Sequence, residues 1–108
     1  MSRFESVAVV KAANIYHGGQ VTSRTVEFSD GSVKTLGIML PGDYEFGTDQ
    51  AELMEITQGA LDYLLSGRDT WASVRSGDAF HVPAQSSFKL KVREVTDYVC
   101  SYLDASAS

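Results

Sequence analysis

Two charged side chains, Glu52 and Arg24, stand at positions that the strand pattern turns inward. Glu52 alternates with Met54, and Arg24 alternates with Val26 and Phe28. Because alternate residues of a strand share one face, each charge is expected to lie on the same face as its apolar neighbours. An inward carboxylate can oppose positive charge, and a guanidinium binds oxyanions through two parallel hydrogen bonds. A salt-bridged strand residue and a surface arginine are the competing structural interpretations.

Three aromatic residues, Tyr44, Phe46 and Phe88, form the second group of residues that could bind a substrate. Phe88 begins a strictly alternating segment in which it faces the core together with Leu90 and Val92. Aromatic side chains can stack on a heterocyclic base, and such stacking tolerates any base because every base has a π-face. Plain core packing is an equally good interpretation of each ring.

The remaining candidates carry weaker signals. His81 could donate to a base or contact phosphate, but a lone histidine between two apolar residues is more often structural. Tyr102 is expected to face inward, where its hydroxyl needs a partner, and Met39 is core filler that can also line a ligand site. Cys100 has no activating neighbour in sequence and is not expected to be a nucleophile. His17 is interpreted as a loop residue.

These residues lie in a chain dominated by short strand signals that are separated by Gly, Pro and Asp turns. The predicted strands are 21–28, 33–40, 44–46, 52–57, 60–65, 71–75, 79–82, 87–93 and 97–103, and residues 4–16 favour strand over helix. The pattern predicts an all-β, closed or sandwiched domain. We expect residues 1–108 to form a single domain, with residues 1–3 and 105–108 flexible.

Composition narrows the possible partners. The chain has 108 residues and a formal net charge of -5, which argues against nucleic acid and against anionic membranes as partners. It contains one cysteine, so no disulfide can form within the chain, and this favours a reducing cytoplasm. No apolar run approaches the length of a membrane span, and we expect no signal peptide.

Two spaced motifs resemble those of the cupin superfamily, which implies a single-domain, jelly-roll-like β-barrel. Six residues separate Glu52 from Gly59, and five separate Gly77 from Pro83. Metal-dependent cupins carry histidine ligands around these motifs, whereas Tyr44, Phe46 and Phe88 occupy the corresponding positions here. The resemblance therefore implies a barrel with an aromatic-lined pocket and no metal or other cofactor.

A narrower resemblance covers nearly the whole chain, from Asn14 to Leu103. Segments 35–46, 52–61 and 77–83 are similar to the small bacterial pyrimidine/purine nucleoside phosphorylases, and Gln85 is a departure from the glycine of many cupins. The resemblance implies a pentosyltransferase that converts a nucleoside and phosphate into a free base and ribose 1-phosphate. In this chemistry we expect Arg24 to hold phosphate and Glu52 to act on the ribose side.

Two alternatives stay open. The first is a non-catalytic cupin that binds a small molecule, because cupin barrels serve many functions. The second, a metal-dependent dioxygenase or isomerase, is disfavoured because the chain has only two histidines, neither at a cupin metal position. We further expect a cytoplasmic homodimer in which the strand at residues 4–10 pairs with the partner's sheet.

Overall fold

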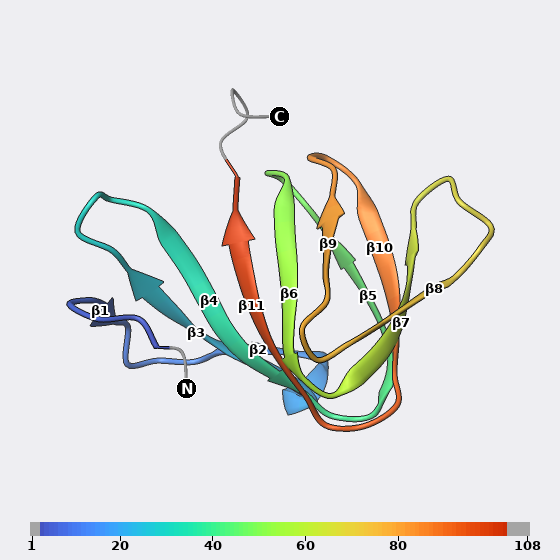
Figure 1. Cartoon of the computed structure of the whole chain (residues 1–108), viewed down its shortest axis with the longest axis horizontal. Helices are drawn as coiled ribbons and strands as arrows, with labels where there is room; N and C mark the ends of the chain where they lie inside the picture. The colour runs from blue at the N-terminus through green and yellow to red at the C-terminus, as the bar shows by residue number, and fades with distance from the viewer. Residues whose placement is uncertain (1–2, 104–108) are drawn as a thin grey trace.

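A computed structural model describes residues 3–103, which form two antiparallel sheets (Figure 1). Sheet A contains β1 (Ala8–Val9), β2 (Asn14–Tyr16), β3 (Val21–Glu27), β4 (Val33–Met39), β6 (Glu52–Gln58), β9 (Ala79–Val82) and β11 (Thr96–Tyr102). Sheet B contains β5 (Gly42–Gly47), β7 (Ala60–Leu65), β8 (Ala72–Arg75) and β10 (Ser87–Val92). The predicted strands are confirmed to within two residues at each end. The expectations for residues 1–2 and 105–108 lie outside the described part of the chain.

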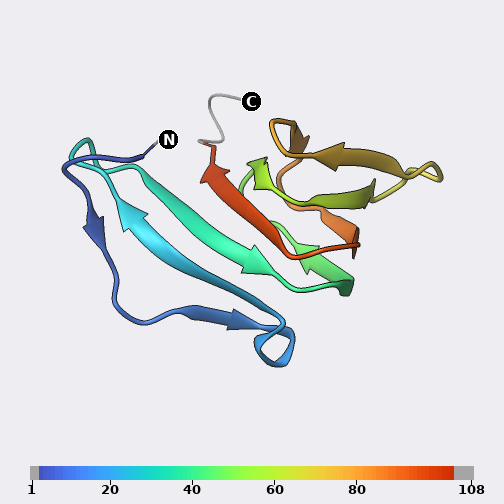
Figure 2. The same ribbon diagram turned by 60° about the horizontal axis from the view of Figure 1, so that its bottom comes forward.

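The strand order identifies an open jelly roll. Sheet A runs β1-β3-β4-β11-β6-β9, with β2 also paired to β3, and sheet B runs β5-β10-β7-β8. Among residues 3–103 no ladder joins one sheet to the other. The strands converge at the lower end of Figure 1 and fan apart at the upper end, and Figure 2 shows the two sheets from below. The all-β jelly-roll prediction is confirmed, but the sheets are not closed into a barrel.

The hydrophobic core lies between the inner faces of the two sheets. Sheet A contributes Met39, Met54, Ile56, Phe80 and Val82, and sheet B contributes Tyr44, Leu61, Phe88, Leu90 and Val92. The predicted inward alternation of Phe88, Leu90 and Val92 is confirmed, since all three are buried. Burying each such side chain contributes about 1.5–3 kcal/mol. The core therefore fixes which face of each strand turns inward.

Gly59 makes the corner at which the chain passes from β6 in sheet A to β7 in sheet B. Its φ is +99°, and a Cβ placed on it would lie 2.4 Å from Thr96 Oγ1 and 2.6 Å from the Val95 carbonyl oxygen. Only glycine combines this left-handed backbone with so close an approach. The corner locks the end of β6 against the start of β11, and the two strands then run side by side toward Glu52 and Tyr102.

Candidate functional site

Polar side chains cross the inner face of sheet A in register. In the first row, Asn14 on β2 lies opposite Ser23 on β3, and Gly37 on β4 lies between Ser23 and Tyr98 on β11. The second row consists of Thr25, Thr35 and Cys100, and the third pairs Tyr102 with Glu52. A face that packs against another sheet is normally apolar, so this band of hydroxyl, amide, thiol and carboxyl groups marks the candidate site.

Glu52 is the half-buried carboxylate of this band. The Cys100 thiol donates a hydrogen bond to Glu52 Oε1 over a sulfur–oxygen distance of 3.5 Å. Burial raises the pKa of Glu52 above its ordinary value, and the hydrogen bond from Cys100 offsets part of the rise. The same burial, with Glu52 beside it, raises the pKa of Cys100 to about 12, so the group is a neutral thiol at pH 7. Such a thiol is a poor nucleophile but a usable hydrogen-bond donor.

Tyr98 lies flat across Gly37 and reaches β3. A Cβ on Gly37 would lie 2.4–2.5 Å from Cζ, Cε1 and the hydroxyl oxygen of Tyr98, so the missing side chain makes room for the ring. Burial raises the pKa of Tyr98 well above its usual value, and a hydrogen bond with Ser23 offsets part of the rise. The Asn14 amide nitrogen donates to Ser23 Oγ and to Thr25 Oγ1, at 3.2 Å in each case. These four side chains therefore form one connected polar group.

Aromatic rings occupy the inner face of sheet B. Phe46 stacks on Phe88 with a centroid distance of 5.8 Å, and Phe88 meets Phe80 of sheet A edge to face at 6.3 Å. Tyr44 and Phe88 are buried, whereas Phe46 is half-buried. The ring of His17, in the 3-10 turn η1 (His17–Gly19), lies 5.0 Å from that of Tyr44 and 5.1 Å from that of Phe46. Phe46 is thus the accessible member of the three rings predicted from the sequence.

Tyr16 joins the aromatic and polar walls. Its ring meets Phe46 edge to face at a centroid distance of 5.7 Å. It also lies close enough to Tyr98 and Tyr102 to add to the rise that burial causes in their pKa values, which for Tyr102 reaches about 12. The Tyr16 and Tyr102 side chains are 40% and 37% exposed. Glu52 and Phe46 are half-buried, so part of each of these four residues stays open to solvent.

The prediction that Arg24 points inward is wrong. Val26 and Phe28 do share a face with Arg24, but that face is the outer one, and neither residue belongs to the core between the sheets. Arg24 lies opposite the exposed Leu36, and its guanidinium donates to the Lys11 carbonyl oxygen. Val26 is buried on this outer face, so burial was mistaken for inward orientation. Arg24 therefore lies away from Glu52.

His81 and Met39 are also separated from the accessible surface. His81 lies opposite Leu53 in the β6–β9 ladder and is exposed on the outer face, because its neighbours Phe80 and Val82 take the inward positions. Met39 is 1% exposed and packs in the core beside Val21. By contrast, Glu52 and Tyr102 occupy the inner face that alternation predicts, and Phe46 packs against the core from sheet B.

Comparisons with known proteins agree with this arrangement. The model of the pyrimidine/purine nucleoside phosphorylase family matches residues 11–102. A protein of that name from Sulfurovum sp. is 61% identical over 103 residues, covering 95% of this chain and all of the relative. Another from Hydrogenovibrio crunogenus is 58% identical over 104 residues, covering 96% of this chain and all of the relative.

The chain belongs to the pyrimidine/purine nucleoside phosphorylase family. Its fold also matches solved structures. A protein of unknown function from Acinetobacter sp. ADP1 superposes with a TM-score of 0.91 at 40% identity, covering 94% of this chain and 98% of that one. A cupin superfamily protein from Desulfitobacterium hafniense superposes with a TM-score of 0.63 at 19% identity over 79% of each chain, which supports the cupin fold.

In this member of the phosphorylase family, the strands turn their basic side chains outward. Within residues 3–103, the strand residues Arg24, Lys34, Arg75, Lys89 and Lys91 all lie on the outer faces of the sheets, as the register shows. Across the same residues, no three side chains of His, Cys, Asp or Glu gather as a metal site would require. The inner face therefore offers hydrogen bonds and aromatic rings, with Glu52 as its carboxylate.

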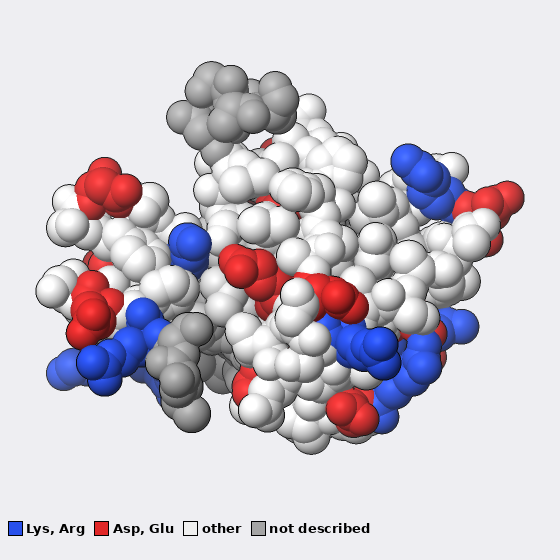
Figure 3. Space-filling model, in the orientation of Figure 1, with Lys and Arg blue, Asp and Glu red and all other residues white. Residues whose placement is uncertain are grey.

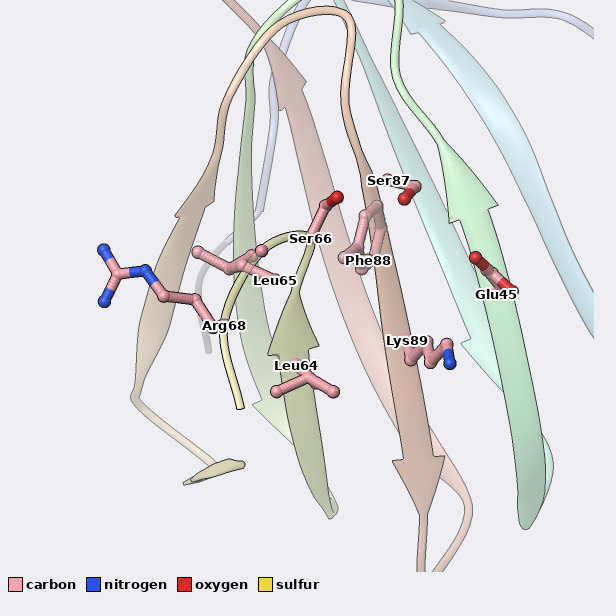
Figure 4. Close-up of a pocket in the computed structure, with 9 residues that line it drawn as sticks. Glu45, Leu64, Leu65, Ser66, Arg68, Ser87, Phe88 and Lys89 are labelled. Atoms are coloured by element: carbon pink, nitrogen blue, oxygen red, sulfur yellow. The ribbon is translucent and has the colours of Figure 1, made fainter. Parts of the chain in front are cut away.

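The outer surface of residues 3–103 shows no comparable arrangement. A shallow hollow of about 220 Å³ lies against the outside of sheet B, between Glu45, Lys89 and Arg68 (Figure 4). Its charged side chains are exposed and of both signs. Acidic and basic side chains are likewise interspersed on the face drawn in Figure 3. Of the described segments, none is a helix long and apolar enough to span a bilayer.

Sequence reasoning did not single out Tyr16, Tyr98, Ser23, Asn14 or Thr35 as site residues. The sequence pattern around these residues gives only a weak indication that they belong to a site. Two of the five, Ser23 and Thr35, lie on strands whose alternate positions also include valine or methionine, so a serine or threonine is an ordinary member of the pattern. Tyr98 lies on the same face of β11 as Tyr102, which was predicted to face inward. These residues become neighbours only through the pairing of β2 with β3, β3 with β4 and β4 with β11, which the sequence does not reveal.

Proposed function

We propose that this protein is a nucleoside phosphorylase of broad specificity, acting on purine and pyrimidine nucleosides. The observation that carries the proposal is the meeting of two walls at Tyr16. One wall holds the half-buried carboxylate Glu52 beside Tyr102, and the other holds Phe46 in front of Phe88. A nucleoside has the matching halves, a hydroxyl-rich sugar and a flat base. The names of relatives that are 50–61% identical support the same activity.

The proposed reaction transfers a pentosyl group. The C1′–N bond breaks and its electron pair leaves with the base, while a phosphate oxygen forms the new bond to C1′. The base then takes up a proton. Positive charge builds up on the ribose during this step, and Glu52 is placed to oppose it. The Tyr102 hydroxyl hydrogen-bonds the sugar, and Phe46 stacks on the base, with Tyr44 and Phe88 behind it in the core.

The proposed reaction uses no metal and no cofactor. The chemistry needs an oriented phosphate, a tolerated ribosyl cation and a stabilised leaving base, and none of these requires a Lewis acid. By the cupin resemblance, the aromatic side chains of Tyr44, Phe46 and Phe88 correspond to the histidines of metal-dependent cupins, and they offer no imidazole nitrogen. Chelator treatment separates this proposal from its metal-dependent alternative.

We also propose that the enzyme works as a cytoplasmic homodimer. The single cysteine, which has no partner for a disulfide within the chain, supports the location. Exposed apolar side chains on the outer face of sheet A, namely Ile15, Leu36 and Ile38, support self-association. Strand β1 pairs with β3 of its own chain and leaves its other edge available to a partner. Light scattering at micromolar concentration tests the assembly, and a monomer there would rule it out.

The activity is tested by incubating the pure protein with phosphate and a panel of uridine, cytidine, inosine, guanosine and adenosine. Chromatography should show free base and ribose 1-phosphate in equal amounts, and only when phosphate is present. Glu52→Gln, which keeps the shape and removes the charge, should lower kcat while the circular dichroism spectrum is unchanged. A protein that is stabilised by nucleosides in a thermal shift assay but releases no base would instead be a binding cupin.

A further inference from the structure

Behind Glu52 lies a set of buried hydrogen-bonding groups that do not reach the accessible surface. Thr35 on β4 is directly opposite Cys100 on β11, and Tyr102, two residues further along β11, is directly opposite Glu52 on β6. The Thr35 and Tyr102 hydroxyls are both hydrogen-bond partners of the Cys100 thiol, and they are also partners of each other. Thr35 is 5% exposed and Cys100 4%. These two residues support Glu52 and Tyr102 from the side away from any substrate.

We propose that Thr35 and Cys100 are positioning residues that fix the orientation of the Glu52 carboxylate for the transfer of the pentosyl group. This inference rests on the proposed function. Neither side chain is placed to contact the substrate, and each acts through its hydrogen-bond neighbour.

The hydrogens available to these side chains determine which group donates each hydrogen bond. The thiol has one hydrogen, which it donates to Glu52 Oε1 at 3.5 Å, so any hydroxyl bonded to the sulfur must donate to it. The Tyr102 and Thr35 hydroxyls are both partners of the sulfur, and Cys100 donates its own hydrogen to Glu52. Removing the Thr35 hydroxyl takes one hydrogen-bond partner from the Cys100 thiol and one from the Tyr102 hydroxyl. The thiol that bonds Glu52 is then held by Tyr102 alone.

The network also sets the protonation behaviour of Glu52. The titratable groups that face Glu52 are Cys100 and Tyr102 on β11, whereas its opposite neighbour on β9 is Val82. Burial raises the pKa of Glu52, and the thiol hydrogen bond works against that rise. Loss of the network should weaken this hydrogen bond, so the pKa of Glu52 should move further upward. The acidic limb of the kcat–pH profile should then shift to higher pH.

The decisive experiment compares Thr35→Val with Thr35→Ser in the full-length protein. Valine has the shape of threonine without its hydroxyl, and serine keeps the hydroxyl. We expect Thr35→Val to lower kcat by about 3- to 10-fold, the equivalent of one lost hydrogen bond, with KM for the nucleoside nearly unchanged. Thr35→Ser should restore most of kcat. Thr96→Val is the matched control, because Thr96 is buried and its hydroxyl donates to the Glu94 and Ala60 carbonyl oxygens, away from Glu52.

A second comparison protects the test against misfolding of the Thr35 variant. Cys100→Ala removes the thiol donor and should lower kcat at least as much as Thr35→Val, whereas Cys100→Ser keeps a donor and should retain more activity. Because both residues act on the same carboxylate, the loss of kcat in the double variant Thr35→Val/Cys100→Ala should be smaller than the product of the two single losses.

The outcomes separate the two proposals. If the wild-type protein releases base but Thr35→Val matches wild type in kcat and in its pH profile, the positioning role is refuted and the activity stands. If the wild-type protein releases no base, the proposed activity fails. A carbon-13 NMR titration of the Glu52 carboxyl then still tests the network, because Thr35→Val should raise its pKa and Thr96→Val should not. Equal loss of kcat in Thr35→Val and Thr96→Val would also refute the inference.

Discussion

Replacing Gly37 with alanine adds one methyl group at the point where the Tyr98 ring crosses β4. The methyl carbon would lie 2.4–2.5 Å from three atoms of the ring, well inside van der Waals contact. Gly37 has no left-handed φ, so the backbone itself accepts a side chain. Alanine in a strand interior is otherwise favoured over glycine by roughly 0.5–1 kcal/mol. Overpacking of a buried site costs about 1–3 kcal/mol. This cost exceeds the gain from alanine, so the free energy of unfolding should fall.

We therefore expect Gly37→Ala to destabilise the protein by about 1–2 kcal/mol, with a fall in Tm of roughly 4–15 °C. Urea denaturation followed by circular dichroism measures the change. Gly47→Ala is the matched control, because its nearest neighbour is the Ser86 carbonyl oxygen at 3.8 Å and its φ is not left-handed. Gly37→Ala should also displace the Tyr98 hydroxyl from Ser23. The rate of nucleoside phosphorolysis should therefore fall in Gly37→Ala and stay unchanged in Gly47→Ala.

A double-variant cycle isolates the cause. In a Tyr98→Leu background the ring is absent, so Gly37→Ala should cost much less than it does in the wild-type protein. A coupling energy near zero would show that the ring does not depend on the empty position at Gly37. Wild-type stability of Gly37→Ala itself would refute the packing argument directly.

Four further outcomes follow from the structure. Arg24→Ala should leave kcat/KM for phosphate within about twofold and stability within about 0.5 kcal/mol, because the side chain is exposed on the outer face; a large rise in KM for phosphate would contradict this placement. Glu52→Gln should gain stability relative to wild type as pH rises above 4.5, because a carboxyl whose pKa is raised on folding stabilises the folded state only while protonated; denaturant titrations from pH 4 to 7 would show a flat difference if burial has no such effect. Cys100 should react with iodoacetamide at pH 8 far more slowly in the folded protein than in urea, and equal rates would contradict its burial. Dialysis against EDTA should leave phosphorolysis unchanged, whereas loss that zinc or iron restores would overturn the metal-free proposal.

The strands and their turns were predictable from the sequence because each depends on local signals. The alternation of Phe88, Leu90 and Val92 reports burial on one face, and the glycine, proline and aspartate positions end the strands. Alternation also placed Glu52 correctly, since Met54 and Ile56 are core residues. It failed for Arg24 because Val26 is buried outside the main core. The alternation of residues along a strand shows which of them share a face, but it does not show which face turns inward.

The polar band on sheet A was not predictable by the same means. Its members come from β2, β3, β4, β11 and β6, and their proximity follows from ladders that pair residues far apart in sequence, such as Thr35 with Cys100. A single serine or threonine in a strand gives no sign of its neighbours across the sheet. Gly37 gives equally little sign, since its role depends on a ring 61 positions later in the chain.

The division of groups between the two sheets bears on specificity for the base. A pocket that reads a base edge needs free donors and acceptors, and a mismatched base then leaves them unpaired at a high cost. The aromatic wall has few such groups near Phe46: Phe88 and Phe80 have no polar side-chain atoms, and the Tyr44 hydroxyl donates to the Leu40 carbonyl oxygen at 2.6 Å. The polar rings beside Phe46 are those of His17 and Tyr16, at its rim. Its π-faces accept purines and pyrimidines alike. The hydrogen-bonding groups gather instead on sheet A, where the sugar that all nucleosides share would lie, and this arrangement favours breadth in the base over selectivity.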